Sequence, residues 1–333
     1  MKVLLVSNYK KGTGGISGQV ELLAKNLTKE GIEVEIFNTK GSILYRLGCK
    51  KRLKCKAIDY DVIHIHCCSN FGFFPAVLGV TVGRRLGKRT VLTYHGGGAE
   101  SFFNRHKRFV RHFLCRTDAN IVLSGYLGQV FDKFEIPYTI IPNVIEFDTS
   151  HYKERQTIKP NFISIRTLSP LYNIECILRA YKIVKNQIPE ASLRIVGDGP
   201  SRESLEEMAR TEEIKDVTFV GRVSNTEIYN QLDQADIMLS TPRIDNMPVS
   251  VLEGFNAGLL VISSSVGGVP YMIEDGINGL LFKDDDENEL SQKMIYAIKE
   301  QTKSQNMILN AHNDVRKYQW TTIRESLLSL YGQ

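Results

Sequence analysis

The sequence has no long hydrophobic run. No stretch of about 18 apolar residues occurs, so a transmembrane helix is not predicted. The apolar start, residues 1–7, is too short for a signal peptide and predicts a first strand instead. Low-complexity tracts are also absent, and 42% hydrophobic with 24% charged residues is typical of a globular chain. These features predict a cytoplasmic protein, and 333 residues are enough for two domains.

Cysteines are few, and their spacing suggests no shared role. None of the six forms a CxxC pair; they are Cys49, Cys55, Cys67, Cys68, Cys115 and Cys176. The sequence therefore favours reduced thiols, and neither a disulfide framework nor a zinc site is predicted.

Acidic residues are scarce in the first half. Residues 1–150 hold 22 Lys and Arg against 12 Asp and Glu, whereas residues 151–333 hold 20 against 25. The basic excess is clustered at 50–56, 84–89 and 105–116. Such charge suits an anionic membrane surface, a phosphorylated acceptor or nucleic acid, and the plain alternative is solvated helix faces. No nucleic-acid-binding motif accompanies the charge, so a peripheral place on the inner face of a membrane is favoured over nucleic acid.

Strand and helix patterns alternate along the chain. This alternation predicts a parallel α/β architecture. Residues 144–160 lack periodicity and are interpreted as a linker, so the predicted domains are 1–150 and 151–317.

A glycine-rich loop follows the first predicted strand. Gly12 and Gly14 fit the dinucleotide pattern GxGxxG, but Ser17 takes the third glycine position. The second predicted strand ends in Asn38, where an acid for a ribose is expected. NAD binding is therefore disfavoured, and a flexible turn that approaches a ligand remains.

Three histidines fall near strand ends in the first half. His64 and His66 share one face of a predicted strand. A metal pair is one interpretation, but a third ligand is not evident, and hydrogen-bonded histidines are favoured. His95 follows another strand and precedes Gly96-Gly97-Gly98, at the edge where open α/β sheets bind ligands.

The stretch from Ser240 to Gly258 places two acids around a helix start. Asp245 lies in a loop after a predicted strand, and Glu253 lies eight positions later on a predicted helix. The amides of the helix N-terminus form an anion site, and the acids can accept hydrogen bonds from hydroxyl groups. A sugar nucleotide fits this pattern, and the alternative is an ordinary strand–loop–helix unit with capping acids.

Polar and glycine residues follow several strands of the second half. The segments are Arg166, Gly197–Gly199, Arg222, Asp245–Glu253 and Gly267-Gly268. Because the carboxyl ends of parallel strands share one edge, these segments are expected to converge there. The convergence favours a binding site over a structural turn.

The chain resembles the retaining glycosyltransferases of the GT-B fold, family 4, also called glycosyl transferases group 1. The resemblance covers nearly the whole chain. Its marks are Gly14-Gly15, Thr93-Tyr94-His95-Gly96, Ser164-Ile165-Arg166, IVGDGP at 195–200, FVGRV at 219–223, ADIMLSTP at 235–242, VGGVP at 266–270, and the acid–x7–acid motif from Asp245 to Glu253.

The resemblance implies two Rossmann-like, doubly wound parallel-sheet domains facing across a cleft. The acceptor would lie on residues 1–150 and the nucleotide sugar on residues 151–317, with residues 318–333 packing back on the first domain. It further implies retaining transfer of a hexose from a nucleotide sugar, with a UDP-sugar expected, to a glycan or lipid-linked acceptor in polysaccharide or glycolipid synthesis. No metal or other cofactor is expected.

The resemblance assigns the reacting centre to His95, Asp245 and Arg166. His95 matches the histidine beside the reacting sugar, Asp245 matches the acid near the donor sugar, and Arg166 matches an arginine that binds the diphosphate. Glu253 matches the acid that bonds the ribose hydroxyls.

Further donor contacts follow from the same resemblance. The amides near Val249 and Ser250 match those that reach the sugar and diphosphate, and Arg222 and Val223 lie where the family holds the base. The remaining expected donor-site residues are Gly14, Gly15, Gly197, Asp198, Gly199, Met247 and Pro248.

Two departures from the family pattern stand out. Asp245 replaces the usual glutamate, and no lysine occurs in the segment from Arg166 to Asn173, where the family carries one. These departures keep a non-catalytic nucleotide-sugar-binding protein as an alternative, beside a GT-B epimerase or phosphorylase. The DxD at 284–286 precedes a predicted helix and is interpreted as helix N-terminal charge.

Overall fold

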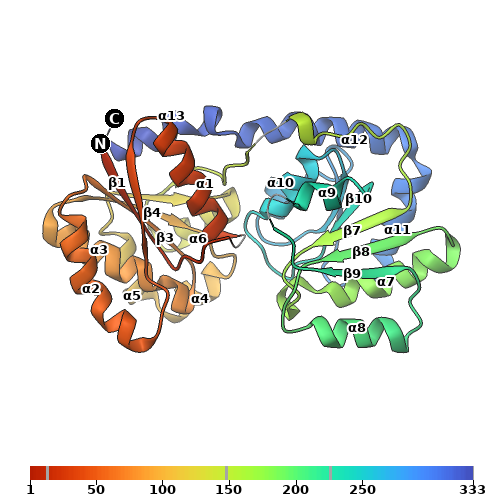
Figure 1. Ribbon diagram of the computed structural model, residues 1–333, viewed down its shortest axis with the longest axis horizontal. Helices are drawn as coiled ribbons and strands as arrows, with labels where there is room; N and C mark the ends of the chain where they lie inside the picture. The colour runs from red at the N-terminus through yellow and green to blue at the C-terminus, as the bar shows by residue number, and fades with distance from the viewer. Residues whose placement is uncertain (13–14, 147–148, 225–226, 333) are drawn as a thin grey trace. The chain divides into compact units, whose positions relative to one another are not determined.

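The computed structural model describes residues 1–12, 15–146, 149–224 and 227–332 (Figure 1). It divides the chain into two compact units, Met1–Glu146 with Tyr318–Gln333, and Phe147–Lys317. Each unit is built on its own six-stranded sheet, and all the strand pairs within both sheets are parallel. The predicted parallel α/β fold is therefore confirmed.

The sheet of the first unit has the order β2-β1-β3-β4-β5-β6. Alternate residues of its strands enter two separate cores: Leu4 and Val6 pack on one face, and Val3 and Leu5 on the other. Apolar residues on both faces explain why helices cover the sheet on two sides. The strands are β1 (Lys2–Ser7), β2 (Glu33–Asn38), β3 (Val62–Cys67), β4 (Arg89–Tyr94), β5 (Ala119–Val122) and β6 (Thr139–Ile140).

Helices from both ends of the chain complete the first unit. The C-terminal helix α13 buries Ile323, Leu327 and Tyr331 in the same core as Val3 and Leu5. Figure 1 shows α13, in blue, beside the red α1. The helices are α1 (Ile16–Lys29), α2 (Ile43–Ala57), α3 (Phe74–Leu86), α4 (Ala99–Arg105), α5 (Lys107–Leu114), α6 (Gly125–Lys133) and α13 (Trp320–Tyr331), with the 3₁₀ turn η1 (Asn70–Phe73).

The sheet of the second unit has the order β12-β11-β10-β7-β8-β9. The chain starts in the middle at β7, moves to one side through β8 and β9, and then to the other through β10. This reversal creates a switch point between β7 and β10, where open sheets of this kind bind ligands. The strands are β7 (Asn161–Ile165), β8 (Ser192–Val196), β9 (Val217–Gly221), β10 (Ile237–Ser240), β11 (Leu260–Ser264) and β12 (Leu280–Phe282).

The helices of the second unit cover a continuous core. Phe162, Leu193, Ile237 and Ile262 of four neighbouring strands are buried in it. The helices are α7 (Ile174–Gln187), α8 (Arg202–Thr211), α9 (Ile228–Leu232), α10 (Val249–Asn256), α11 (Glu287–Lys299) and α12 (Gln301–Asp314), and the 3₁₀ turns are η2 (Thr149–His151), η3 (Pro170–Tyr172), η4 (Val269–Tyr271) and η5 (Val315–Tyr318).

Two elements of the structure are short. Strand β6 contains only Thr139–Ile140, both exposed at the sheet edge. Helix α9 has five residues, and residues 225 and 226 lie outside the described residues. Asp286 caps α11 by accepting a 2.9 Å hydrogen bond from the Glu289 amide, which confirms the helix interpretation of that acidic run.

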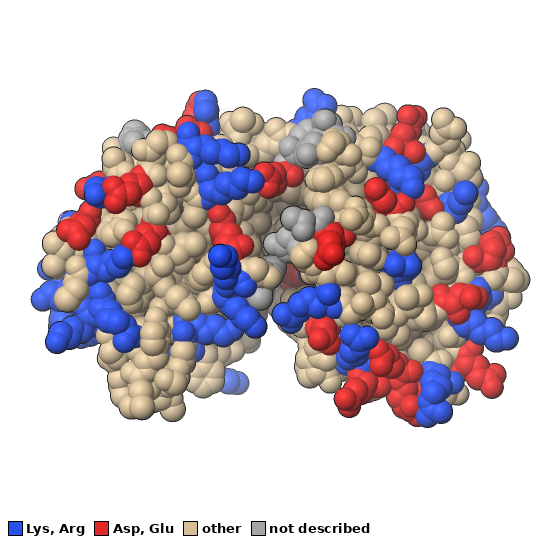
Figure 2. All heavy atoms as spheres, in the orientation of Figure 1, with Lys and Arg blue, Asp and Glu red and all other residues tan. Residues whose placement is uncertain are grey.

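The hydropathy of the helices and the distribution of charged side chains were the two surface features noted in the sequence. Within the described residues, no helix combines the length and the apolar run that a bilayer-crossing segment needs. Figure 2 shows Lys and Arg side chains gathered around the lower part of the first unit, on the left of the view. The three basic clusters noted in the sequence all belong to this unit.

Candidate functional site

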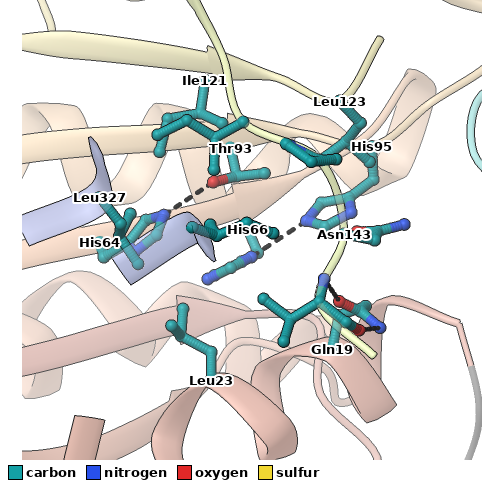
Figure 3. A pocket seen from close by; sticks show the side chains of 14 residues that line it. Gln19, Leu23, His64, His66, Thr93, His95, Ile121, Leu123, Asn143 and Leu327 are labelled. Atoms are coloured by element: carbon teal, nitrogen blue, oxygen red, sulfur yellow. Dashed lines mark hydrogen bonds between the residues drawn. The ribbon is translucent and has the colours of Figure 1, made fainter. Parts of the chain in front are cut away.

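Three histidines form a row in the first unit, of which His64 and His66 are buried and His95 is partly buried (Figure 3). His66 of β3 and His95 after β4 are hydrogen-bonded, with 3.0 Å between His66 Nδ1 and His95 Nε2. His64 stacks on His66 with ring centroids 4.4 Å apart. Its own nitrogens bond the Tyr331 hydroxyl at 2.6 Å and Thr93 Oγ1 at 2.7 Å. His64 is therefore a fully hydrogen-bonded structural histidine, as the sequence favoured.

Burial keeps the whole row uncharged at neutral pH. It lowers the pKa of His64 to about 3 and that of His95 to about 4, and it lowers the pKa of His66 well below its usual value. Neighbouring histidines add to the effect on His64 and His66. A neutral His95 can exchange hydrogen bonds with a neutral hydroxyl group, such as that of a sugar.

A small cavity lies against this row. It measures about 40 Å³ and is lined by the three histidines together with Gln19 of α1 and Leu327 of α13. Gln19 fixes the opposite wall by exchanging two hydrogen bonds, of 2.9 and 3.0 Å, with the backbone of Val144. In the described part of the chain, His66 Nε2 is buried without a hydrogen-bond partner. The cavity has room for roughly two water molecules, which would satisfy that nitrogen.

The glycine loop of the first unit is only partly described. Gly15 precedes α1 with a φ of 62°, a conformation that favours glycine, and a Cβ there would meet open space. Gly14, expected to approach the donor with it, lies outside the described residues.

An ion pair occupies the switch point of the second sheet. Arg166 directly follows β7, and Asp245 lies in the loop after β10. Arg166 Nη1 is 3.1 Å from Asp245 Oδ2, and Nη2 donates a 3.1 Å hydrogen bond to Ser240 Oγ at the end of β10. The Arg166 side chain is 8% exposed and that of Asp245 is 20% exposed. The two residues assigned to the reacting centre in this unit are therefore in direct contact.

Tyr172 occupies part of the segment where the family carries a lysine. The Arg166 guanidinium lies 5.0 Å from the centre of the Tyr172 ring, within the range of a cation–π contact. Burial raises the pKa of Tyr172, so its hydroxyl stays neutral. Among the described residues, Arg166 Nε is buried without a hydrogen-bond partner. The sequence did not indicate Tyr172, because only the tertiary contact distinguishes it from other loop tyrosines.

Glycines let two turns pack directly on the backbone of the loops that carry Arg166 and Asp245. A Cβ on Gly197, at a φ of +139°, would lie 1.8 Å from the Arg166 carbonyl oxygen, and one on Gly199 would lie 2.2 Å from that of Leu168. A Cβ on Gly267 would lie 2.1 Å from the Asp245 carbonyl oxygen. The VGGVP motif marked Gly267 in the sequence, but its role as a support for Asp245 appears only in the structure.

The N-terminus of α10 is available to an anion. Pro248 precedes the helix, no side chain caps it, and its first turn contains no acid. Met247 and Pro248 are buried, and Val249 is partly exposed. In the described chain, Ser250 Oγ is buried without a hydrogen-bond partner. The helix dipole and unbonded amides of such a terminus attract phosphate.

Glu253 lies one turn further along α10. Burial raises the pKa of its carboxyl to about 7, and Arg166 acts in the opposite direction. The acid is therefore near the midpoint of its ionisation at neutral pH. Two hydroxyl groups donated to the carboxylate would favour the charged form.

The remaining predicted residues lie at the same sheet edge without joining this group. Asp198 is exposed, and its carboxylate accepts a 2.9 Å hydrogen bond from the Gly199 amide. Arg222 is exposed and Val223 is partly buried just after β9, two strands from β7. Among the described residues, no hydrogen bond or ion pair links these side chains to Arg166, so their donor roles remain predictions.

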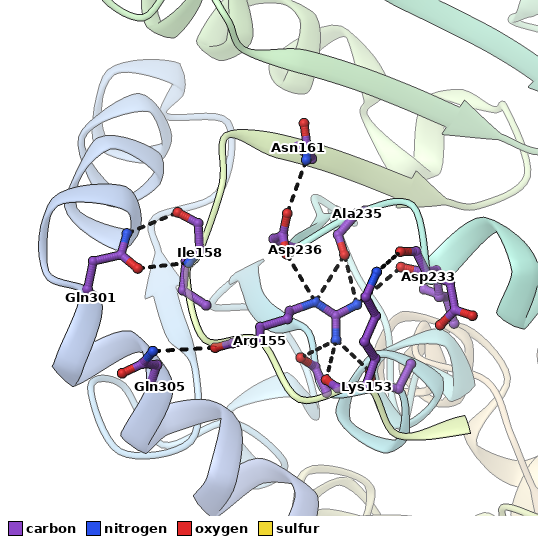
Figure 4. Close-up of polar contacts among 12 residues, drawn as sticks. Lys153, Arg155, Ile158, Asn161, Asp233, Ala235, Asp236, Gln301 and Gln305 are labelled. Carbon is purple, nitrogen blue, oxygen red and sulfur yellow. Dashed lines mark hydrogen bonds and ion pairs between the residues drawn. The ribbon is translucent and has the colours of Figure 1, made fainter. Parts of the chain in front are cut away.

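A buried arginine, Arg155, binds the backbone before β10 and after α10, at the ends away from the Asp245 loop (Figure 4). Arg155 is 5% exposed and donates to five backbone carbonyls, those of Leu232, Ala235, Ala257, Gly258 and Lys153. Its Nε also lies 3.3 Å from Asp236 Oδ1. Four of these carbonyls, all but that of Lys153, flank β10 and α10; Asp245 lies in the loop between these two elements, and Glu253 lies on α10. The segment interpreted as a linker is therefore fixed to the second unit at this residue.

The sequence comparisons agree with this arrangement. The model for the family described as glycosyl transferases group 1 matches residues 148–314, and that for glycosyltransferase family 4 matches residues 41–149. An uncharacterized glycosyltransferase of Methanocaldococcus jannaschii is 22% identical, over 96% of this chain and 95% of its own. The alpha-monoglucosyldiacylglycerol synthase of Streptococcus pneumoniae is 24% identical, over 84% and 74%.

The structural comparison identifies the same fold. The Anabaena protein HepE, solved in complex with UDP and glucose, superposes with a TM-score of 0.81 at 19% identity, over 100% of both chains. Its likeness extends to both sheets of the present chain. The chain belongs to the glycosyl transferases group 1 family and is a glycosyltransferase of the GT-B fold.

Proposed function

We propose that this glycosyltransferase moves a hexose from a UDP-sugar to a glycan or lipid-linked acceptor, with retention of the anomeric configuration. The donor proposal is supported by HepE, which was solved with UDP and glucose. The acceptor class is supported by the pneumococcal relative, whose name describes glycolipid synthesis. Polysaccharide or glycolipid synthesis is the corresponding cellular role.

The Arg166–Asp245 ion pair and the N-terminus of α10 are the main support for this proposal. Arg166 provides a buried cation at the switch point, and α10 presents its N-terminus on the loop that holds Asp245. A diphosphate needs both kinds of group, because its charge must be neutralised by a cation and by oriented amides. Glu253 on the same helix supplies the acceptor for ribose hydroxyls.

The proposed reaction exchanges one bond at the sugar. The bond from the anomeric carbon to the β-phosphate oxygen breaks, and its electron pair leaves with UDP. The acceptor oxygen attacks from the same face, and its proton passes to the departing phosphate oxygen. Arg166 stabilises the negative charge on that phosphate. Asp245 holds the sugar through its hydroxyl groups, and the family resemblance assigns a like role to His95.

The donor site is proposed to work without a metal. Arg166 and the α10 amides offer the neutralisation that a divalent cation supplies in other phosphate sites. Transfer should therefore persist at an unchanged rate in excess EDTA. A loss of activity in EDTA that Mg²⁺ or Mn²⁺ restores would contradict this part of the proposal.

A donor screen tests the function directly. The protein is incubated with UDP-, GDP- and ADP-sugars and cell-derived lipid acceptors, and the products are identified by mass spectrometry. A UDP-sugar should be consumed, with slow hydrolysis in the absence of acceptor, and the product should keep the anomeric configuration. Failure to bind any nucleotide sugar by calorimetry would overturn the proposal.

A second candidate is a nucleotide-sugar-binding protein without turnover. Two observations favour it: Asp245 is engaged by Arg166, and Tyr172 occupies part of the segment where the family carries a lysine. This candidate predicts donor binding with neither hydrolysis nor transfer, and binding that is unchanged in His95→Ala. Any catalytic turnover of a donor excludes it.

The first unit is proposed to meet an anionic membrane surface. The support is its excess of Lys and Arg, 22 against 12 Asp and Glu in residues 1–150. Charge at a membrane of this kind contributes about 1 kcal/mol for each nearby basic residue. A lipid-linked acceptor would be reached from such a surface, on the cytoplasmic side.

A further inference from the structure

Helix α2 exposes an apolar end. Ile43 is 79% exposed, Leu44 81% and Leu47 75%, and all three lie in its first five residues. The opposite face is packed in the core through Cys49, Leu53 and Ala57 at four-residue spacing. The helix is therefore anchored by one face while its N-terminal turn presents large aliphatic side chains to solvent, which is costly unless something covers them.

Positive charge follows the apolar end on the exposed side. Lys50, Lys51 and Lys54 are exposed, and in the described residues none of them forms an ion pair. The helix contains no Asp or Glu at all. In contrast, Lys56 is paired with Glu35. The lysines nearest the apolar end are thus available to an external anion.

The helix geometry separates the two features by a short axial distance. Leu47 and Lys51 are four residues apart and share a side of the helix, which corresponds to a rise of about 6 Å. From Ile43 to Lys54 the rise is about 16 Å. An apolar end buried about 5–10 Å into a bilayer surface would place the lysines at the level of the lipid head groups.

The space-filling view agrees with this arrangement. In Figure 2 the lowest part of the first unit, where Figure 1 draws one end of α2, shows no charged side chains, and Lys and Arg lie above it on both sides. An uncharged projection surrounded by positive charge fits a surface with an apolar interior and anionic head groups.

We propose that α2 docks the protein on an anionic bilayer, with Ile43, Leu44 and Leu47 in the interfacial region and Lys50, Lys51 and Lys54 on the lipid phosphates. A lipid surface is favoured over a protein partner because the apolar end is a single helical turn, far smaller than a standard protein interface. The inference locates the membrane contact of the proposed function, and it is independent of the transfer reaction.

Vesicle binding without donor tests the proposal. Full-length protein is sedimented with phosphatidylcholine vesicles that contain either 30% or no phosphatidylglycerol, at rising salt. The wild type should bind the anionic vesicles, and binding should weaken steeply with salt. The triple variant Ile43→Ser, Leu44→Ser, Leu47→Ser should bind at least about tenfold more weakly. Replacing Lys50, Lys51 and Lys54 by Gln should weaken binding about fivefold for each lysine.

Matched controls come from the second unit. Leu309 and Ile277 are half exposed, and Leu309→Ser with Ile277→Ser should leave vesicle binding unchanged. Lys159, Lys215 and Lys299 are exposed, and their triple Gln variant removes the same charge elsewhere. UDP binding in solution should be unaffected in all four variants, so a failure of the donor site is recognised separately from a failure of docking.

The insertion depth of α2 in the bilayer and the self-association of the protein complete the test. A Leu44→Trp side chain should be quenched by lipids brominated near the head of the acyl chain, relative to the parent protein. Equal vesicle binding by the wild type and the Ile43/Leu44/Leu47 variant would overturn the proposal. So would lipid-free dimerisation of the wild type that this variant abolishes, because the apolar end would then bind a second copy of the chain.

Discussion

Arg166 is a cation that binds the Asp245 carboxylate and that would also bind the donor diphosphate. The two side chains are 3.1 Å apart in a largely buried setting, and the Tyr172 ring covers part of the guanidinium. A donor phosphate that bonds the same NH groups must compete with the Asp245 carboxylate or share the cation with it. Under the proposed function, the shorter acid, which departs from the family pattern, would therefore act on leaving-group charge as well as on the sugar.

Removing the Asp245 charge should therefore strengthen the binding of UDP. Asp245→Asn releases a pair that contributes about 1 kcal/mol, which corresponds to roughly fivefold in affinity. Transfer should fall in the same variant, because the sugar loses its carboxylate. Calorimetry with UDP measures the first effect and product formation the second. Asp233→Asn, on the opposite side of β10, is the control, and an unchanged or lower UDP affinity in Asp245→Asn would reject the competition.

Glu253 should show opposite effects on stability and on binding. Burial raises its pKa from 4.5 to about 7, so between these values the folded chain holds a proton that the unfolded chain releases. Stability from this group is present below about pH 4.5 and is lost as the pH rises through 7. Glu253→Gln should therefore stabilise the protein at pH 8 by on the order of 2 kcal/mol, with little effect at pH 4.5.

The same substitution should weaken donor binding at pH 8. An ionised carboxylate accepts from two ribose hydroxyls more strongly than an amide does, so affinity should fall by about tenfold or more. Urea unfolding and calorimetry at the same pH separate the two quantities. A variant that is both less stable and weaker in binding would indicate a structural role in place of a ribose contact.

At the level of elements, most residues of the site lie on short loops that follow strands. These loops are held in place by glycine turns and by single side chains. Strand ends were predictable because strand patterns such as 192–196 stop at glycine or a polar residue, and parallel strands share an edge. The short strand β12 was not predicted, because three residues give no periodicity. The contact of Tyr172 with Arg166 was also inaccessible, since both residues lie in the loop after β7 and no sequence pattern gives the path of that loop.

Arg155 illustrates a support that sequence patterns do not indicate. Its acceptors are the backbone carbonyls of Lys153 and of four residues in 232–258, which carry no side-chain signature. Replacing it by Ala leaves Asp236 without its cation and several buried carbonyls without donors. We expect Arg155→Ala to lower the stability of the second unit by about 3–5 kcal/mol.

The position of the single tryptophan makes this loss measurable in one unit. Trp320 lies in the first unit, where its Nε1 donates a 2.8 Å hydrogen bond to Glu30. In urea, Arg155→Ala should shift the circular dichroism transition to lower denaturant while the tryptophan transition stays in place. Lys159→Ala, at an exposed position, should shift neither. Parallel shifts in both signals would mean that the units unfold together.

At the level of the whole molecule, the two units hold different titrating groups in their cores. The first unit holds His64, His66 and His95 in their neutral forms. Each histidine has a lowered pKa, so its contribution to stability is present above pH 6.5 and is lost as the pH falls towards 4. The family resemblance predicted the fold class of both units, but the hydrogen-bonded row required the register of β3 against β4.

Mild acid should therefore weaken the first unit selectively. Its unfolding free energy should fall between pH 6.5 and pH 4 by up to about 1.4 kcal/mol per pH unit for each histidine. Urea transitions followed by Trp320 fluorescence test this slope, and imidazole NMR signals should show no titration of His95 above pH 5. A midpoint for His95 near 6.5 would contradict the buried neutral row.

The packing of α13 on β1 has a consequence for synthesis on the ribosome. Val3 and Leu5 share a core with Ile323 and Leu327, so this core stays open until the last helix has been translated. At ordinary elongation rates of about 5–20 residues per second, the interval between residues 146 and 331 lasts roughly 10–40 s. The second unit, complete by residue 317, can close before the first. Strand β1 is therefore translated early, but one of its faces is covered only when α13 has been made. A chaperone that shields this apolar face has that interval in which to act.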